Sequence, residues 1–317
     1  MAEAVAEATL VGTRPHRRGA VLGWSAALIS AAAFGTSGAF AKPLLASGWS
    51  AGAVVAVRLG LAAVVLLVPA LLALRGRWRL LLDHWAELLC YGVFGGATAQ
   101  VSFFNAVQYV PVALGILLEY LGIVLVVAWV ALSRRRLPSW LTLTGVAIAI
   151  IGLVVVLNPF GVGTIDPRGI AWGALAACGL AVYYVVSARP MTLPPLTFVA
   201  VGLAIGTVTI LLAGVVGLMP LQVSTANVEF VGVTMPWWLP LLELALVAAA
   251  AAYALGFVGV QHLGSTVASF VGLTEVLFAV GWAWLLLGEL PGVLQLLGGV
   301  IMLTGVAAVQ RGQALEG

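Results

Sequence analysis

The chain has 317 residues, of which 63% are hydrophobic and 8% are charged. Soluble proteins carry about 25% charged residues, so this composition excludes a water-soluble globule. The formal charge of +3 does not indicate nucleic-acid binding, because the arginines lie between hydrophobic runs and do not gather on one face. The composition predicts a polytopic helical membrane protein that lies in a lipid bilayer.

Ten apolar runs follow a polar N-terminal segment. Residues 1–20 are small, polar and basic and lack the apolar core of a secretory signal, so we expect a disordered cytoplasmic tail. Each later run approaches the roughly 20 apolar residues that cross a bilayer. The predicted helices comprise residues 21–41, 51–74, 86–108, 111–132, 141–158, 169–187, 196–219, 237–262, 264–287 and 292–310.

Lysine and arginine are distributed unequally between the two sets of loops. Eleven arginines lie in segments on the N-terminal side of the bilayer, whereas Lys42 and Arg168 lie on the other side and Arg58 lies inside a helix. Positively charged loops stay in the cytoplasm. We therefore expect an inner-membrane protein with both termini in the cytoplasm, residues 311–317 forming a C-terminal tail.

An internal repeat relates the two halves of the chain. A shift of 153 residues superposes Phe104 on Phe257, Gln108 on Gln261, Trp129 on Trp282, Leu137-Pro138 on Leu290-Pro291, Gly145 on Gly298 and Gly152 on Gly305. The repeated unit has five helices, and because five is odd the second copy enters the membrane in the opposite orientation. We therefore predict an all-α membrane protein of ten transmembrane helices, built from two inverted repeats at residues 21–158 and 169–310, with a transport site between them.

Four charged residues lie within the predicted spans: Arg58, Glu119, Glu243 and Glu275. A charge at a helix centre costs about 2.5–3.5 kcal/mol in insertion, so each is a candidate functional residue. At 1.5 Å per residue, Arg58, Glu119 and Gln100 lie about 10–12 Å from the outer ends of their helices, and Glu275 lies in the same layer. Glu243 lies about 9 Å from the outer end, where its side chain can extend to the interface.

Proton exchange is the role we expect for Glu119 and Glu275, because a carboxyl group in a buried site can titrate near neutral pH. Arg58 would bind a substrate carboxylate or keep a glutamate ionised. Tyr120 could stack on a substrate and Gln100 could hydrogen-bond to it. The alternative is a static Arg58–Glu119 pair that only joins two helices.

Three stretches resemble the EamA-type exporters of the drug/metabolite transporter superfamily. Residues 273–306 contain an acidic residue, an apolar run, Gly-Glu and a glycine-rich last helix, as in the second repeat of that family. Residues 107–122 are similar to the first-repeat pattern of the threonine/homoserine-exporter-like branch, and Gly35, Lys42-Pro43 and Arg58 resemble the family opening. Ile123 and Val276 stand where the family pattern has proline, so no proline kink is predicted there.

The resemblance implies proton-coupled export of amino acids or similar small metabolites by rocking of the two repeats. The sequence has no nucleotide-binding motif and its three histidines lie apart, so we expect a gradient-driven transporter with no cofactor and no metal site. Nothing in the sequence requires an oligomer. The alternatives are an exchanger of nucleotide sugars or phosphorylated metabolites, an intramembrane enzyme and a non-catalytic scaffold. Residues 220–236 form an outer loop that could lie on the membrane or cover the site.

Overall fold

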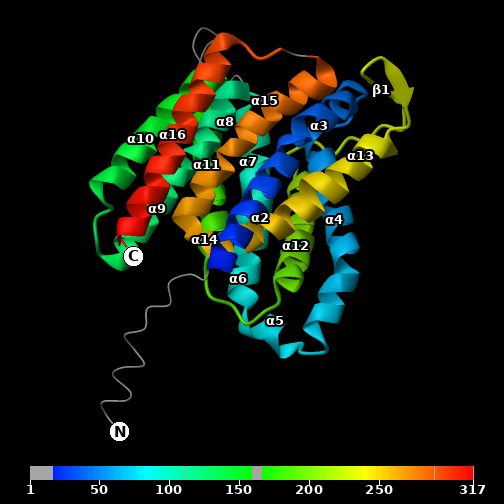
Figure 1. Ribbon diagram of the computed structural model, residues 1–317. Helices are drawn as coiled ribbons and strands as arrows, with labels where there is room; N and C mark the ends of the chain where they lie inside the picture. The colour runs from blue at the N-terminus through cyan, green and yellow to red at the C-terminus, as the bar shows by residue number, and fades with distance from the viewer. Residues whose placement is uncertain (1–16, 111, 159–165, 289, 317) are drawn as a thin grey trace.

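The computed structural model describes residues 17–110, 112–158, 166–288 and 290–316, which form a helical bundle with a two-stranded hairpin at one end (Figure 1). Among these residues, eight helices are long and apolar enough to cross a membrane. Two further predicted spans have a different form. Trp85 to Ala106 is helical throughout but partly π-helical, and Thr274 to Leu286 is shorter. The helical membrane class is confirmed, and the count of ten crossings stays a prediction.

The first half of the chain contains most of the helix interruptions. Its elements are α2 (Arg17–Gly35), α3 (Ser37–Ala46), α4 (Ala51–Leu74), α5 (Arg79–Asp83), α6 (Trp85–Leu89), the π-helical η1 (Cys90–Thr98), α7 (Ala99–Ala106), α8 (Val112–Tyr120), α9 (Gly122–Arg134) and α10 (Trp140–Leu157). The side chain of Ser50 caps α4 by accepting a hydrogen bond from the Ala53 N–H, which fixes where this span begins.

The second half contains the hairpin. Its elements are α11 (Pro167–Ser187), α12 (Pro195–Val215), β1 (Val228–Phe230), β2 (Val233–Met235), α13 (Trp238–Ala245), the π-helical η2 (Leu246–Ala251), α14 (Ala252–Gly272), α15 (Thr274–Leu287) and α16 (Val293–Glu316). Within α14 the backbone leaves helical geometry at Gly264, where φ is 76° and ψ is 165°. A residue with a Cβ rarely adopts this φ, which explains the glycine. The predicted boundary between residues 262 and 264 therefore marks a real change of direction.

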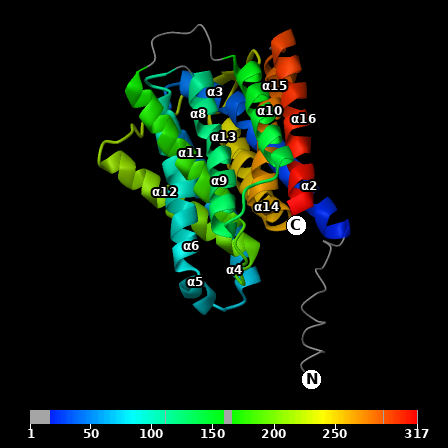
Figure 2. The ribbon, with the colours of Figure 1, turned by 90° about the vertical axis from the view of Figure 1, so that its left-hand side faces the viewer.

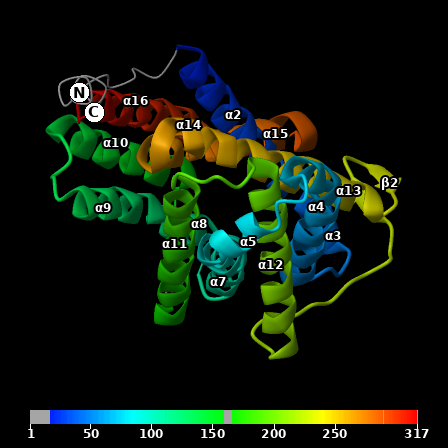
Figure 3. The ribbon, with the colours of Figure 1, turned by 90° about the horizontal axis from the view of Figure 1, so that it is seen from below.

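The two ends of the bundle differ. We call the end where α2 begins and α16 ends the terminal end, and the opposite end the hairpin end. Seen from the terminal end, α9, α10 and α16 lie on one side of the bundle and α3, α4 and α13 lie on the other (Figure 3). The exposed arginines of the loops after α4 and α9 lie at the terminal end with α5 (Figure 1).

Helices α10 and α16 form the closest helix pair, and they lie side by side along their length (Figures 1 and 2). A Cβ on Gly145 would lie 2.6 Å from the Val309 nitrogen, and a Cβ on Gly298 would lie 2.6 Å from the Val156 nitrogen. Along these contacts the residue numbers rise on α10 while they fall on α16, so the two helices are antiparallel. Glycines let such backbones approach closely in a bilayer.

Other helix pairs also join the first half of the chain to the second. Helix α2 packs along α14, α4 packs along α12, and α11 packs along η1 and α7. The Ser30 hydroxyl on α2 donates a 2.7 Å hydrogen bond to the Ala252 carbonyl on α14. The buried core accordingly contains side chains from both halves, with Leu59, Tyr91, Phe198 and Phe257 almost completely covered.

The loop of residues 220–236 folds onto the bundle and contains a two-stranded hairpin, so the expected all-α class needs a small correction. Strands β1 and β2 pair antiparallel around Val231 and Gly232, which both have positive φ, as a tight hairpin turn requires. Phe230 stacks on Phe40 of α3 with ring centroids 5.0 Å apart, and Val228 is buried. These contacts place the hairpin against the hairpin-end surface of α3 and α13.

Two predicted boundaries at the termini are wrong. The first span begins at Arg17 and continues through α3 to Ala46, which places Lys42 inside a helix and not in the outer loop. The predicted tail 311–317 is helical to Glu316, because alanine, leucine, glutamine and arginine favour helix beyond the apolar run. Residues 1–16 of the predicted N-terminal tail lie outside the described residues.

Candidate functional site

Arg58 lies on α4 inside the bundle, with 7% of its surface exposed. Its Nη1 donates to the Ser37 hydroxyl at 3.3 Å, and its Nη2 donates to the Gln100 Oε1 at 3.2 Å. Its Nε is buried and has no hydrogen-bond partner within the described part of the chain. The guanidinium therefore joins the start of α3 to α7 and keeps one N–H group uncommitted.

Glu119 and Glu275 lie beside two interruptions of the helical path. Glu119 is the penultimate residue of α8, just before the break at Leu121, and Glu275 is in the first turn of α15, just after the break at Leu273. Both side chains are half-buried, and they interact electrostatically with each other and with Arg58. The structure thus brings the three predicted charged residues into one group, which we call the central cluster.

The regular helical hydrogen-bond pattern changes at Leu121 and Leu273 without proline, although the backbone of both residues stays in the right-handed helical region. The glycine beside each break packs closely on another element: a Cβ on Gly122 would strike the Ala177 carbonyl of α11, and one on Gly272 would strike the Tyr184 hydroxyl. The sequence offered no proline at Ile123 or Val276, yet the helices are interrupted. Close packing of glycine is the feature that both breaks share.

Tyrosines surround the two carboxyl groups. The Tyr120 hydroxyl is hydrogen-bonded to the Glu275 carboxyl, and Tyr184 interacts electrostatically with both glutamates. The rings of Tyr183 and Tyr184 meet edge to face with centroids 4.9 Å apart, and both residues are buried. Tyr120 was predicted at this place, whereas Tyr184 was not.

Glu243 was expected to extend toward the interface, and this expectation is wrong. Its Oε1 lies 2.7 Å from the Thr36 hydroxyl at the break between α2 and α3, while its Oε2 is buried with no hydrogen-bond partner among the described residues. Glu243 also interacts electrostatically with Arg58. Glu243 is therefore a second-half carboxyl group close to the central cluster.

Sequence reasoning overlooked Ser37 and Thr36, which contact Arg58 and Glu243. Both lie within an apolar run that the sequence predicts as one continuous helix. The signal that could have found them is the run Gly35-Thr36-Ser37-Gly38, because small and hydroxyl residues have low helix propensity. On the same helix as Gln100, the Asn105 side chain donates to the carbonyl of Val101.

The arrangement combines one fixed cation with carboxyl groups and tyrosine hydroxyls. Such a group can bind the two ends of a zwitterion, and it can take up and release a proton. In the described ranges, no three histidine, cysteine, aspartate or glutamate residues come together as metal ligands would. The fold and this cluster define a multi-pass helical membrane protein with ionisable side chains inside its bundle.

The chain belongs to the EamA-like transporter family, whose model matches residues 21–158 and again residues 167–310. The predicted EamA family is therefore confirmed. The threonine/homoserine-exporter-like branch stays a prediction.

A curated protein and a solved structure are among the proteins similar to this chain. The "Uncharacterized inner membrane transporter YicL" of Salmonella typhimurium is 31% identical over 100 residues, which are 31% of this chain and 33% of that protein. The match therefore spans about a third of the curated relative. A solved structure described as "Crystal structure of protein" has a TM-score of 0.73 at 16% identity and covers 92% of this chain and 97% of its own. This second likeness concerns the fold alone.

Proposed function

We propose that the protein is a secondary active transporter that exports amino acids or similar small metabolites in exchange for protons, by alternating access. The observation that carries this proposal is the central cluster, in which Arg58, Glu119 and Glu275 interact inside the bundle. The first two come from α4 and α8 in the first family match, and the third comes from α15 in the second. Charges kept inside a membrane protein are costly, which favours a role in binding or coupling.

Each member of the cluster has a proposed role. Glu119 and Glu275 carry the exchangeable proton, and their partial exposure leaves them accessible to water or substrate. Arg58 binds the substrate carboxylate through the N–H that the protein leaves uncommitted. Gln100 orients Arg58 and borders the substrate, while Tyr120 orients Glu275. Protonation of a glutamate and binding of a substrate ammonium would then exclude one another, which couples the two fluxes.

We further propose that the two family matches are inverted repeats and that both termini lie in the cytoplasm. The antiparallel contact of α10 with α16 supports the inversion, since these helices occupy equivalent places in the two matches. The arginines at the terminal end support the orientation.

The cluster favours a substrate of small net charge over a nucleotide sugar or a phosphorylated metabolite. A phosphate group is usually bound by several converging lysine or arginine residues. Arg58 is the single cation in the cluster as the described residues build it, and its charge is shared with two carboxyl groups. A zwitterion or a weak cation suits this balance better.

Replacing Glu119 tests the proton role. We expect Glu119→Gln to abolish proton-driven uptake into inside-out membrane vesicles while expression stays unchanged, because the amide keeps the shape of the side chain but cannot exchange a proton. The matched control is Glu229→Gln, which removes an exposed carboxyl group of the hairpin and should transport normally. If Glu119→Gln transports with the pH dependence of the wild type, the proton role is wrong.

The substrate class is tested with radiolabelled amino acids and amines in proteoliposomes. We expect proton-driven counterflow of at least one zwitterionic amino acid and none of a sugar phosphate. A chain in which Arg58, Glu119 and Glu275 are all replaced by neutral residues tests the scaffold alternative. If this variant replaces the wild-type protein in cells without loss of function, a non-catalytic scaffold is favoured instead.

A further inference from the structure

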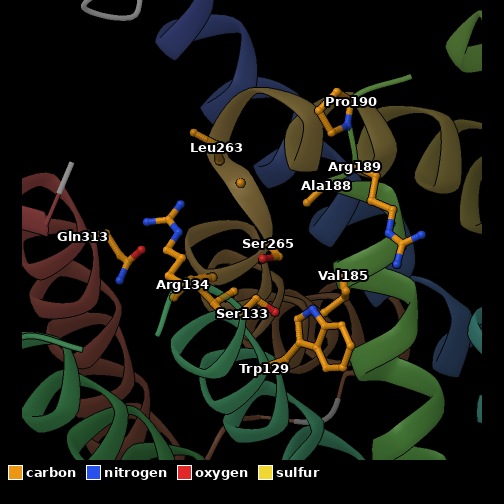
Figure 4. Close-up of a pocket in the computed structure, with 13 residues that line it drawn as sticks. Trp129, Ser133, Arg134, Val185, Ala188, Arg189, Pro190, Leu263, Ser265 and Gln313 are labelled. Carbon is orange, nitrogen blue, oxygen red and sulfur yellow. The ribbon is translucent and has the colours of Figure 1, made fainter. Parts of the chain in front are cut away.

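A polar pocket separate from the central cluster lies at the terminal end. It has a volume of about 280 Å³ and lies between the end of α9, the end of α11, α14 at Gly264 and the last turns of α16 (Figure 4). None of the residues of the central cluster lines it. Ligand sites commonly begin at about 300 Å³, so this volume suits a molecule with few heavy atoms.

One uncommitted cation borders the pocket. Arg134 ends α9, its side chain is exposed, and it has no ion pair within the described ranges. The second arginine, Arg189, already pairs with Glu87 at 3.5 Å. Figure 4 shows the two guanidinium groups pointing to opposite sides of the pocket. The pocket therefore offers the charge of one guanidinium, which suits a monoanion.

Two hydroxyl residues line the same part of the pocket. Ser265 and Thr266 have 9% and 4% of their surfaces exposed, and neither hydroxyl is among the buried side-chain atoms that lack a hydrogen-bond partner. Figure 4 places Ser265 between the Arg134 and Arg189 side chains. Helical structure restarts after Gly264, and the N–H groups of a first helical turn lack partners within the helix. These hydroxyl and N–H groups can donate hydrogen bonds to an anion that enters the pocket.

Most of the remaining lining is apolar, apart from Ser133 and Gln313. Trp129, Val185 and Leu263 provide a surface for an aliphatic or aromatic group, with Ser133 at its edge. We propose that this pocket is a second binding site, which takes a short organic acid with its carboxylate near Arg134, Ser265 and Thr266 and its apolar part against Trp129. This proposal concerns binding alone and does not depend on proton coupling.

The position of the pocket suggests that it loads the central cluster, and this loading role rests on the proposed function. Ser265 precedes Glu275 by ten residues on a nearly continuous helical path, which corresponds to about 15 Å. A substrate released from the pocket would thus move along the Ser265 to Gly272 stretch to reach Arg58.

Calorimetry on the purified full-length protein tests the site, with isovalerate as the probe because it combines a carboxylate with a branched apolar tail. An Arg58→Gln background removes the cation of the central cluster. In this background we expect Arg134→Gln to weaken isovalerate binding at least about tenfold, the usual effect of losing a charge-assisted hydrogen bond. The matched control, Arg136→Gln, removes a neighbouring exposed charge that does not line the pocket and should bind as the background does.

A second measurement does not depend on purification. Ser133→Cys, in a chain whose Cys90 and Cys178 are replaced by alanine, should react with a maleimide in membranes, and isovalerate should slow the reaction several-fold. Any one of three results would overturn the proposal. Arg134→Gln could leave isovalerate binding unchanged, the Arg58→Gln background could fail to bind isovalerate, or inorganic phosphate could bind more tightly than isovalerate. Pocket binding without proton-driven transport would contradict the proposed function and leave the pocket assignment in place.

Discussion

Arg58 holds the central cluster together through the geometry of its guanidinium group. Two of its nitrogens donate in different directions, to Ser37 and to Gln100, and the third is left for another acceptor. A lysine ammonium is a compact point charge and cannot reproduce this planar fork. The side chain therefore sets the distance between α3 and α7 as well as supplying a charge.

Thr36 and Glu243 provide a test at the residue scale. The Thr36 hydroxyl lies 2.7 Å from both the Ala33 carbonyl and Glu243 Oε1, but a hydroxyl has one proton to donate. The Ala33 carbonyl and the Glu243 carboxyl therefore compete for the same proton.

We expect Thr36→Val to destabilise the protein by about 1 kcal/mol, because it leaves the Glu243 carboxyl without its partner. Thr36→Ser keeps the hydroxyl and should retain most of the stability. Thermal unfolding in detergent measures both variants. Equal stability of the valine and serine variants would mean that the hydrogen bond contributes nothing.

At the scale of elements, the sequence predicts the long helices well because each is a continuous apolar run. It misses the breaks at Thr36, Leu121 and Leu273, which need no proline. Each break adjoins a glycine that packs against another helix, but a chain with 38 glycines gives no means of selecting these from the sequence. The breaks depend on tertiary contacts, which a single sequence does not display.

The central cluster was predictable for a different reason. Arg58, Glu119 and Glu275 stand out because few charges occur in apolar runs, and depth along the helices placed them in one layer. The contributions of Ser37, Thr36 and Tyr184 were not predictable, since hydroxyl groups are common in membrane helices and their direction depends on packing.

The contact between α10 and α16 supports a prediction about stability. Gly145→Ala and Gly298→Ala should each destabilise the protein by about 1–3 kcal/mol, because in both cases the new methyl group would lie 2.6 Å from a backbone nitrogen of the other helix. The two effects should be similar, since the contacts are equivalent.

Gly281→Ala is the control for this pair. A Cβ at Gly281 of α15 meets no described atom within 4 Å, so alanine there should be neutral or slightly stabilising. Unfolding in denaturing detergent compares the three variants. If Gly145→Ala is as stable as Gly281→Ala, the backbones of α10 and α16 are not in close contact.

At the scale of the whole molecule, the two halves are interleaved. Helices α2, α4 and α10 of the first half pack along α14, α12 and α16 of the second, respectively. Rocking one half of the chain as a rigid body would separate all three interfaces at once. The moving parts we expect are therefore groups that combine helices of both halves, with the breaks beside Glu119 and Glu275 as points of bending.

The orientation of the bundle is tested by cysteine labelling in a chain without Cys90 and Cys178. We expect Arg136→Cys, at the terminal end, to react with an impermeant maleimide only in inside-out vesicles, because arginine-rich loops remain in the cytoplasm. Thr225→Cys, in the exposed loop before β1, should react only in intact cells. The reverse pattern would invert the topology, and labelling of both from one side would contradict the arrangement of the bundle.

The pairing of α10 with α16 also bears on how such a chain could arise. Gly145 meets Val309 and Gly305, and Gly298 meets Val156 and Gly152, so each helix presents the same surface to the other. A self-complementary surface of this kind is the type by which identical subunits form twofold dimers. A half-length ancestral polypeptide with this glycine face could associate with its own copy before gene duplication and fusion joined the two in a single chain.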